Sequence, residues 1–283
     1  TVLGYQAPLY GRRTAQYLLE PLQFKDARQF YPSFNLEDQV RAYAVYGGTP
    51  AYLHTIQPQQ SLKENILDGI LSRGSFLYDE VRFVLQQELR EPRNYFAILQ
   101  AIAAGKTRLN EIKQATGIDG ATAYLDTLQQ LHLVERLVPV TETQPQKSRR
   151  GIYRLKDHYL RFWFRYVHPN RSQLERGGAQ TILDNQVLSE IDHFASLTFE
   201  EVCQQFFWQS GLTGKLPFVP TNIGNWWNAN EEVDLVVLGE KDAIVVECKW
   251  TSKPVGIDIL AELERKSDLL RPELEHRKIR FAL

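Results

Sequence analysis

The sequence predicts a multidomain α+β protein, and three observations along the chain lead to that fold class. Apolar residues recur at helical spacing over residues 31–92. Residues 93–170 combine helical patterns with two short alternating segments that are typical of strands. Residues 171–283 place several strand patterns among helical ones, which favours a mixed sheet flanked by helices.

Length and composition indicate a globular protein with room for more than one module. The chain has 283 residues, of which 43% are hydrophobic and 24% are charged. No apolar stretch approaches the roughly 20 residues of a membrane span, and no signal-peptide pattern opens the chain. We therefore expect a cytoplasmic protein that does not contact a membrane. Because the chain contains no methionine, we also expect Thr1 to be an interior position of a longer protein.

The first predicted regions are a short mixed segment and a helical one. Residues 1–30 contain the basic turn Gly11-Arg12-Arg13-Thr14 ahead of an apolar stretch. Residues 31–92 show helical patterns at about 36–45, 60–72 and 75–90. The segment Gly47-Gly48-Thr49-Pro50 ends the first of these, because glycine loosens the backbone and the residue before proline disfavours the α region.

Residues 93–170 predict a winged helix-turn-helix. Helical patterns cover about 95–103, 108–116 and 120–131. Alternating segments at 133–138 and 152–155 flank a polar loop at 141–150, as the two strands of a hairpin would. Three helices followed by a hairpin are typical of this motif. The alternative is a small helical bundle with an incidental hairpin.

Residues 171–283 predict a mixed sheet with flanking helices. Helical patterns lie at about 176–190, 193–210 and 258–270. Strand patterns lie at 218–227, 233–238, 243–250 and 279–283. Along the chain, the last helix before the sheet is followed by three strands, a helix and a final strand.

The strongest chemical signal is a predicted hairpin that carries two acidic residues. Its strands are Val233–Val237 and Val245–Trp250, joined by the turn residues 239–242. A turn centred between residues 240 and 241 places Asp234 opposite Glu247, with Cβ atoms about 5 Å apart. Side chains alternate along a strand, so Lys249 shares the face of Glu247.

Two facing carboxylates repel each other unless a cation lies between them. Hard oxygen ligands at this separation suit Mg²⁺ or Mn²⁺, and a neighbouring lysine can stabilise negative charge in a transition state. Glu200 or Glu201, on the helix before the sheet, could supply a third carboxylate. These residues predict a site for phosphodiester hydrolysis. The alternative is a solvated hairpin face with ordinary mixed charges.

Basic residues gather in the middle of a chain whose formal net charge is −1. From Arg93 to Arg171, 13 lysines and arginines stand against 6 acidic residues. Lys147, Arg149 and Arg150 fall in the predicted wing loop, where they could contact DNA phosphates. The alternative is a solvated loop, or a winged helix that contacts only protein. Trp226-Trp227 could stack on bases, although a position in the core or at a sheet edge is the expected one.

Other residues give weaker signals. Cys203 and Cys248 are too few for a disulfide framework or a structural zinc site, and we expect both to be small buried apolar side chains. Gly105-Lys106-Thr107 is not a phosphate-binding loop, because Gln100 stands where the first glycine is needed and a helix precedes it. No such loop occurs elsewhere in the sequence.

Four motifs resemble a known family when they are taken in order. They are Pro8-Leu9-Tyr10-Gly11-Arg12-Arg13-Thr14, Tyr46-Gly47-Gly48-Thr49-Pro50-Ala51-Tyr52-Leu53, Arg161-Phe162-Trp163-Phe164-Arg165 and Glu247-Cys248-Lys249-Trp250. Together they resemble the C-terminal half of the archaeal-type P-loop ATPases, which are similar to AAA+/STAND ATPases. The resemblance covers nearly the whole chain. It implies a helical lid, a winged helix and a C-terminal domain of unknown function that looks like a PD-(D/E)xK nuclease.

The resemblance divides the chain and assigns roles to several positions. Residues 1–30 would be the end of the ATPase core, 31–92 the lid-like region, 93–170 the winged helix and 171–283 the nuclease-like domain. The nuclease-like motif falls on Asp234, Glu247 and Lys249, and the family's upstream glutamate matches Phe199-Glu200, which favours Glu200 over Glu201. Arg12 and Arg13 would sense nucleotide.

The Walker motifs that define the ATPase are absent, so only the full-length parent would bind ATP. The sequence therefore predicts a fragment that binds DNA and carries a metal-dependent nuclease-like domain. The alternative is a catalytically inactive platform for DNA or protein that an ATPase core regulates.

Overall fold

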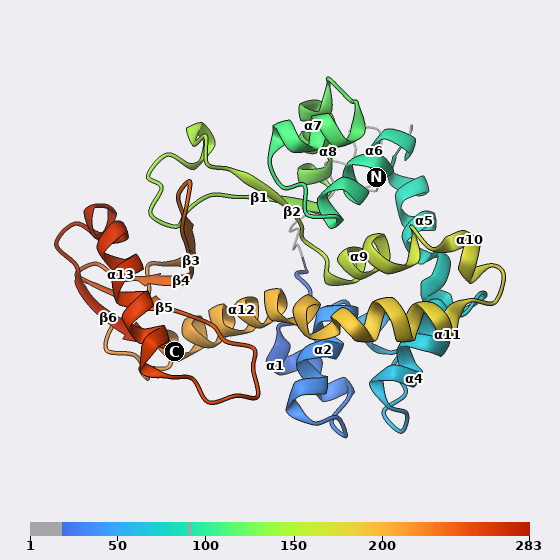
Figure 1. Cartoon of the computed structure of the whole chain (residues 1–283), viewed down its shortest axis with the longest axis horizontal. Helices are drawn as coiled ribbons and strands as arrows, with labels where there is room; N and C mark the ends of the chain where they lie inside the picture. The colour runs from blue at the N-terminus through green and yellow to red at the C-terminus, as the bar shows by residue number, and fades with distance from the viewer. Residues whose placement is uncertain (1–18, 90–91) are drawn as a thin grey trace, which may run out of the picture.

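A computed structural model describes residues 19–89 and 92–283, and it has the mixed α+β architecture that the sequence predicts (Figure 1). The predictions for Arg12 and Arg13 lie outside the described residues. The first helices are α1 (Phe24–Ala27), α2 (Leu36–Tyr46), α3 (Pro50–Leu53), α4 (Leu62–Ile66) and α5 (Phe76–Glu88). A π-helical turn, Leu67–Leu71, extends α4.

The middle of the chain has three helices followed by a two-stranded antiparallel sheet, in the predicted order. The elements are α6 (Pro92–Ala103), α7 (Leu109–Thr116), α8 (Ala121–Gln130), β1 (Val134–Leu137) and β2 (Ile152–Leu155). Gly117 ends α7 in the left-handed conformation, with a φ of 67°. The helices α9 (His158–Phe162) and α10 (Arg171–Leu174) follow the hairpin.

The two helices predicted at 176–190 and 193–210 are one continuous helical segment in the structure. It begins as α11 (Ala179–Ile182), passes through a π-helical turn at Leu183–Val187 and continues as α12 (Leu188–Leu212). The segment stays helical because neither glycine nor proline interrupts it before Gly211. In Figure 1, α12 therefore runs from the helical part of the molecule to the C-terminal sheet.

The C-terminal sheet has the strand order β3-β4-β5-β6. Its strands are β3 (Asn222–Trp227), β4 (Glu232–Leu238), β5 (Asp242–Val246) and β6 (Lys278–Ala282), with α13 (Ile257–Leu274) between the last two. The first three strands are antiparallel, and β6 is parallel to β5. The predicted hairpin register is confirmed, because Leu235 pairs with Val246 and Leu238 with Ala243.

Helices cover both faces of this sheet. On one face, Val237 and Val246 pack with Phe207 of α12. On the other face, Val236 and Val245 pack with Leu263 of α13. The core of the rest of the chain is continuous, because a single cluster of buried side chains extends from Phe24 to Ala195. The predicted divisions near residues 31, 93 and 171 stay predictions.

The loop between β1 and β2, residues 138–151, is attached to the C-terminal sheet. The backbone N–H of Val140 donates to the carbonyl of Asn225 at 2.9 Å, and the indole of Trp227 donates to the carbonyl of Arg150 at 3.0 Å. Trp226 is 1% exposed, which matches the expected core position, and its indole donates to Glu273 of α13. These bonds hold the hairpin loop against β3 and α13.

Gly48 is a position where the fold admits no larger residue. A Cβ atom there would lie 1.9 Å from the carbonyl oxygen of Leu22, whose own N–H donates to the Gly48 carbonyl at 2.8 Å. We expect Gly48→Ala to lower the free energy of unfolding by about 1–3 kcal/mol, because two backbone segments must move apart. Urea unfolding followed by circular dichroism measures this change.

Gly69→Ala is the matched control, because the nearest atom to its added methyl group would be the Tyr46 hydroxyl at 3.8 Å, an ordinary contact. Equal unfolding midpoints for the two variants would contradict the close approach of the Leu22 backbone to Gly48.

Candidate functional site

Asp234 lies at an irregularity in β4 that redirects its side chain. Gly224 pairs with Val236 and Trp226 with Val233, so β4 has one more residue than β3 over this stretch. Such a β-bulge changes the direction of side chains, and bulges are common beside active sites. The Asp234 carboxylate accepts the backbone N–H of Cys248 at 2.7 Å. This side-chain bond takes the N–H of Cys248 just after β5, and regular pairing with β4 ends at Val246, short of the predicted Trp250.

Glu247 and Lys249 lie directly after β5. Glu247 is 7% exposed, and its carboxylate accepts from Lys249 Nζ at 2.5 Å and from Lys266 Nζ of α13 at 3.4 Å. The hydrogen bond to Glu247 is the largest influence on Lys249 and raises its pKa. The pKa of Asp234 is raised by burial, and the negative charge of Glu247 acts in the same direction.

Glu200 of α12 faces the same bulge. Its carboxylate accepts from Asn225 Nδ2 at 3.2 Å, and the same amide group donates to the backbone carbonyl of Asp234 at 2.7 Å. Burial raises the pKa of Glu200 to about 8, and the nearby charges of Asp234 and Glu232 contribute to the rise. A carboxyl group in this position holds its proton at neutral pH unless a cation is present.

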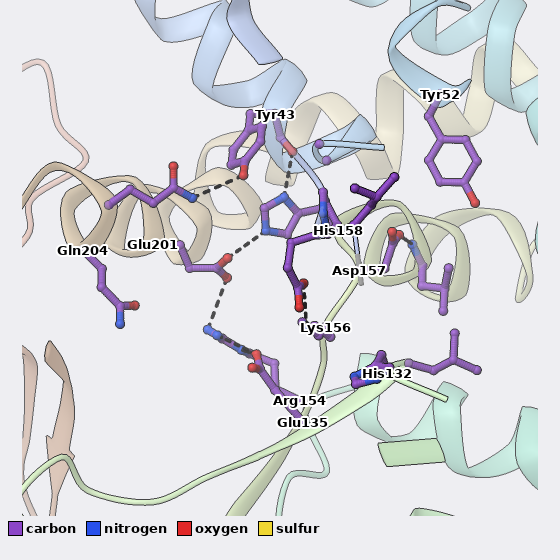
Figure 2. Close-up of a pocket in the computed structure, with 18 of the residues that line it drawn as sticks. Tyr43, Tyr52, His132, Glu135, Arg154, Lys156, Asp157, His158, Glu201 and Gln204 are labelled. Carbon is purple, nitrogen blue, oxygen red and sulfur yellow. Dashed lines mark hydrogen bonds and ion pairs between the residues drawn. The ribbon is translucent and has the colours of Figure 1, made fainter. Parts of the chain in front are cut away.

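Glu201 points to a different place, which Figure 2 shows. Its carboxylate accepts from His158 Nε2 at 2.8 Å and forms ion pairs with Arg161 at 2.7 Å and Arg154 at 3.2 Å. Burial opposes ionisation of Glu201, but the two arginines and the hydrogen bond from His158 hold its pKa well below the ordinary value. The second ring nitrogen of His158 lies 3.0 Å from the carbonyl of Tyr43. Glu201, His158, Arg154 and Tyr43 border a cavity of about 380 Å³.

Sequence reasoning did not find this cluster, because its members come from α2, β2, α9 and α12 and show no spacing motif. The one sequence feature that could have indicated this cluster is the pair of adjacent glutamates, Glu200 and Glu201. Adjacent helical residues point about 100° apart, so only one of the two can face the sheet.

A second cavity, of about 910 Å³, lies between the β1–β2 hairpin and the C-terminal sheet. Glu200, Asp234 and Lys266 line it on the sheet side, and Arg108 and Arg154 line it on the hairpin side. Acidic and basic side chains are equally numerous in this lining, but Glu200 holds its proton at neutral pH, so the lining has a small net positive charge.

The structure gives a mixed result for a metal site. Among residues 19–89 and 92–283, no three side chains of His, Cys, Asp or Glu come together in an arrangement that could hold a metal ion. The Glu247 carboxylate already accepts a hydrogen bond from Lys249, and one Asp234 oxygen accepts the backbone N–H of Cys248. The donor chemistry nevertheless suits a hard cation, since Asp234 and Glu200 are half-buried carboxyl groups with raised pKa values.

The three basic residues of the hairpin loop differ in their surroundings. Lys147 and Arg149 are exposed. The Arg150 guanidinium is paired with Glu273 at 3.2 Å and with Glu142 at 3.3 Å. Arg150 therefore holds the loop on α13, and any phosphate contacts of this loop would depend on Lys147 and Arg149.

The fold and these residues define a mixed α+β protein with acidic residues near the bulge of a four-stranded sheet. We call Glu200, Asp234 and Glu247, together with Lys249, the carboxylate cluster. Residues 163–278 match the DUF234 family, described as archaea bacterial proteins of unknown function. A curated relative, described as uncharacterized protein MJECL04 of Methanocaldococcus jannaschii, is 37% identical over 277 residues. The match covers 95% of this chain and 61% of the relative, so the chain spans about three fifths of that protein's length.

No protein of solved structure matches the chain. Over the described residues, no helix has both the length and the apolar composition needed to cross a membrane.

The raised pKa of Glu200 predicts a pH-dependent stability. In the unfolded chain this group ionises near 4.5, whereas in the folded protein its pKa is about 8. Between these values the unfolded state has released a proton that the folded state retains, so the free energy of unfolding falls as pH rises. Glutamine does not ionise, so Glu200→Gln should lack this pH-dependent loss of stability. We expect the free energy of unfolding of the variant, relative to wild type, to increase from pH 5 to 8 and to stay constant above pH 8.

Urea unfolding at several pH values in metal-free buffer measures the difference. Glu240→Gln, in the exposed β4–β5 turn, is the control and should follow wild type. A stability difference between Glu200→Gln and wild type that does not change with pH would contradict the prediction.

Proposed function

We propose that the C-terminal sheet with α12 and α13 is a divalent-cation-dependent phosphodiesterase that acts on DNA. The observation that carries this proposal is the position of Asp234, which is close to Glu200 of α12 on one side and to Glu247 on the other, with Lys249 bonded to Glu247. The order α12, β3-β4-β5, α13, β6 supports it, because it is the arrangement expected from the resemblance to PD-(D/E)xK nucleases.

A cation would replace the proton on Glu200 and the Lys249 ammonium beside Glu247. Asp234 and Glu247 would bind it, and Glu200 would be a third or outer ligand. The bound cation would act as a Lewis acid and lower the pKa of a coordinated water. Its charge would also make the lining of the 910 Å³ cavity more positive, which favours entry of a phosphate group.

Lys249 would act on the reacting phosphate. When Glu247 turns to the cation, the Lys249 ammonium loses its present partner and becomes available to a negatively charged group. During hydrolysis the water oxygen bonds to phosphorus, and the bond from phosphorus to the leaving sugar oxygen breaks. Lys249 would stabilise the charge that develops on the phosphate oxygens, and Lys266 would continue to neutralise Glu247.

The three-helix region with its hairpin would supply the remaining DNA contacts. We interpret α6, α7, α8, β1 and β2 as a winged helix, with Lys147 and Arg149 contacting phosphates. The longer parent protein would bind ATP through a core that this chain lacks, and Arg12 and Arg13 would sense that nucleotide. The alternative is that the C-terminal domain binds DNA or a partner protein without cleaving DNA.

Three substitutions separate the metal site from the cleavage step. We expect Asp234→Ala and Glu247→Ala to abolish Mn²⁺ binding, because each removes a ligand. Lys249→Ala should keep Mn²⁺ binding and lose the nicking of supercoiled DNA, because Lys249 acts on phosphate. Calorimetric titration with Mn²⁺ and gel analysis of plasmid DNA measure the two properties.

Asp268→Ala is the control for the three substitutions, since this carboxylate is 71% exposed on α13 and should behave like wild type. Binding of Mn²⁺ by both carboxylate variants at the wild-type level would exclude the site and leave the inactive-platform alternative.

The hairpin loop should contribute salt-dependent DNA affinity without setting sequence preference. We expect the double variant Lys147→Ala/Arg149→Ala to bind DNA more weakly. The slope of log affinity against log salt concentration should fall by about 0.9 for each phosphate contact that is lost. Fluorescence anisotropy with a labelled duplex between low and moderate salt measures both quantities.

Arg176→Ala, an exposed substitution outside this loop, serves as the control. Wild-type affinity and an unchanged slope in the double variant would show that the loop does not contact DNA.

A further inference from the structure

The two cysteines of the chain meet behind the carboxylate cluster. Cys203 lies on α12 and Cys248 lies just after β5, far apart in the sequence. Both pack against the same cluster of apolar side chains between α12 and the sheet, next to Val246 and Phe207. Their thiols lie close enough for each to influence the pKa of the other. Neither cysteine is fully buried, so a small oxidant can reach them.

Strand alternation and helix periodicity explain this meeting. Cys248 follows Val246 by two positions, so its side chain points to the sheet face that α12 covers. Cys203 follows Glu200 by three positions, so both lie on the side of α12 that faces the sheet. The N–H of Cys248 donates to Asp234 at 2.7 Å, which fixes the backbone that carries this thiol.

We propose that Cys203 and Cys248 form an intramolecular disulfide when the reduced protein meets a hydroperoxide. Because both side chains pack on the same apolar cluster, side-chain rotations can bring the two sulfur atoms to the length of a disulfide bond, about 2.05 Å. This proposal goes beyond the proposed nuclease function and does not depend on it.

The chemistry balances with the peroxide as the oxidant. One thiol attacks the peroxide and breaks its O–O bond, which gives a sulfenic acid and releases the other oxygen as an alcohol, or as water from hydrogen peroxide. The second thiol attacks the sulfenic sulfur, forms the S–S bond and expels water. In sum, two thiols lose two hydrogen atoms and one peroxide molecule is reduced.

The disulfide would join α12 covalently to the segment that carries Glu247 and Lys249. Cys248 stands between these two residues, and its N–H bonds Asp234, so the cross-link would tie three of the four cluster residues to the helix that carries the fourth. It would also restrict the unfolded chain, and thereby raise the urea concentration at which the protein unfolds.

The experiment treats the reduced, full chain with a small excess of hydrogen peroxide and then alkylates the remaining thiols with a maleimide. We expect both thiols to be lost together, the protein to stay monomeric on a non-reducing gel, and peptide mapping to give one cross-linked pair that contains Cys203 and Cys248. Dithiothreitol should restore both thiols. The oxidised protein should unfold at higher urea than the reduced one.

Cys203→Ser and Cys248→Ser are the matched controls, each with one thiol left. We expect each remaining cysteine to proceed to sulfinic acid, which dithiothreitol does not reverse, and the unfolding midpoint to be insensitive to peroxide. If wild-type protein gives sulfinic acid at one cysteine while the other stays alkylatable, or forms only disulfide-linked dimers, the proposal is overturned.

Discussion

The ionised carboxylate of Glu201 is the interaction on which the arrangement of this molecule depends. It joins His158 and Arg161 of α9 to Arg154 of β2, and His158 in turn bonds the Tyr43 carbonyl of α2. The two arginines and the hydrogen bond from His158 stabilise a charge that burial alone would disfavour. Removal of either arginine would leave this buried charge with one partner fewer, so the packing of these elements on α12 depends on the whole set.

The same interaction sets the rotation of α12 about its axis. With Glu201 held toward α9, Glu200 is directed toward the bulge of β4, about 100° away around the helix. Two adjacent residues of the same type thus have opposite properties. Two arginines and the hydrogen bond from His158 lower the pKa of Glu201, whereas burial and neighbouring carboxylates raise that of Glu200. The fold therefore stabilises Glu201 as a carboxylate and Glu200 as a neutral acid.

The part of the site that depends on local pairing could be predicted from sequence. The turn at 239–242 fixes the hairpin register, and the register places Asp234 near Glu247. The bulge beside Asp234 could not be predicted, because it depends on the pairing of β4 with β3. The ion pair between Arg150 and Glu273 of α13 could not be predicted either, because the sequence of the basic loop does not indicate which distant residue lies against it. The continuous helix through residues 179–212 was missed for a different reason, because a weakening of the apolar pattern resembled a break.

The attachment of the hairpin loop gives the two candidate activities a physical connection. Arg150, Val140 and Trp227 hold the loop against the sheet, and the 910 Å³ cavity lies between the hairpin and the carboxylates. A strand of DNA in that cavity would contact both parts at once, so binding energy gained at the hairpin could position a phosphate at the cluster. In the proposed function a bound cation would make the cavity more positive and would release Lys249 from Glu247, so cation binding would favour the entry of a phosphate group.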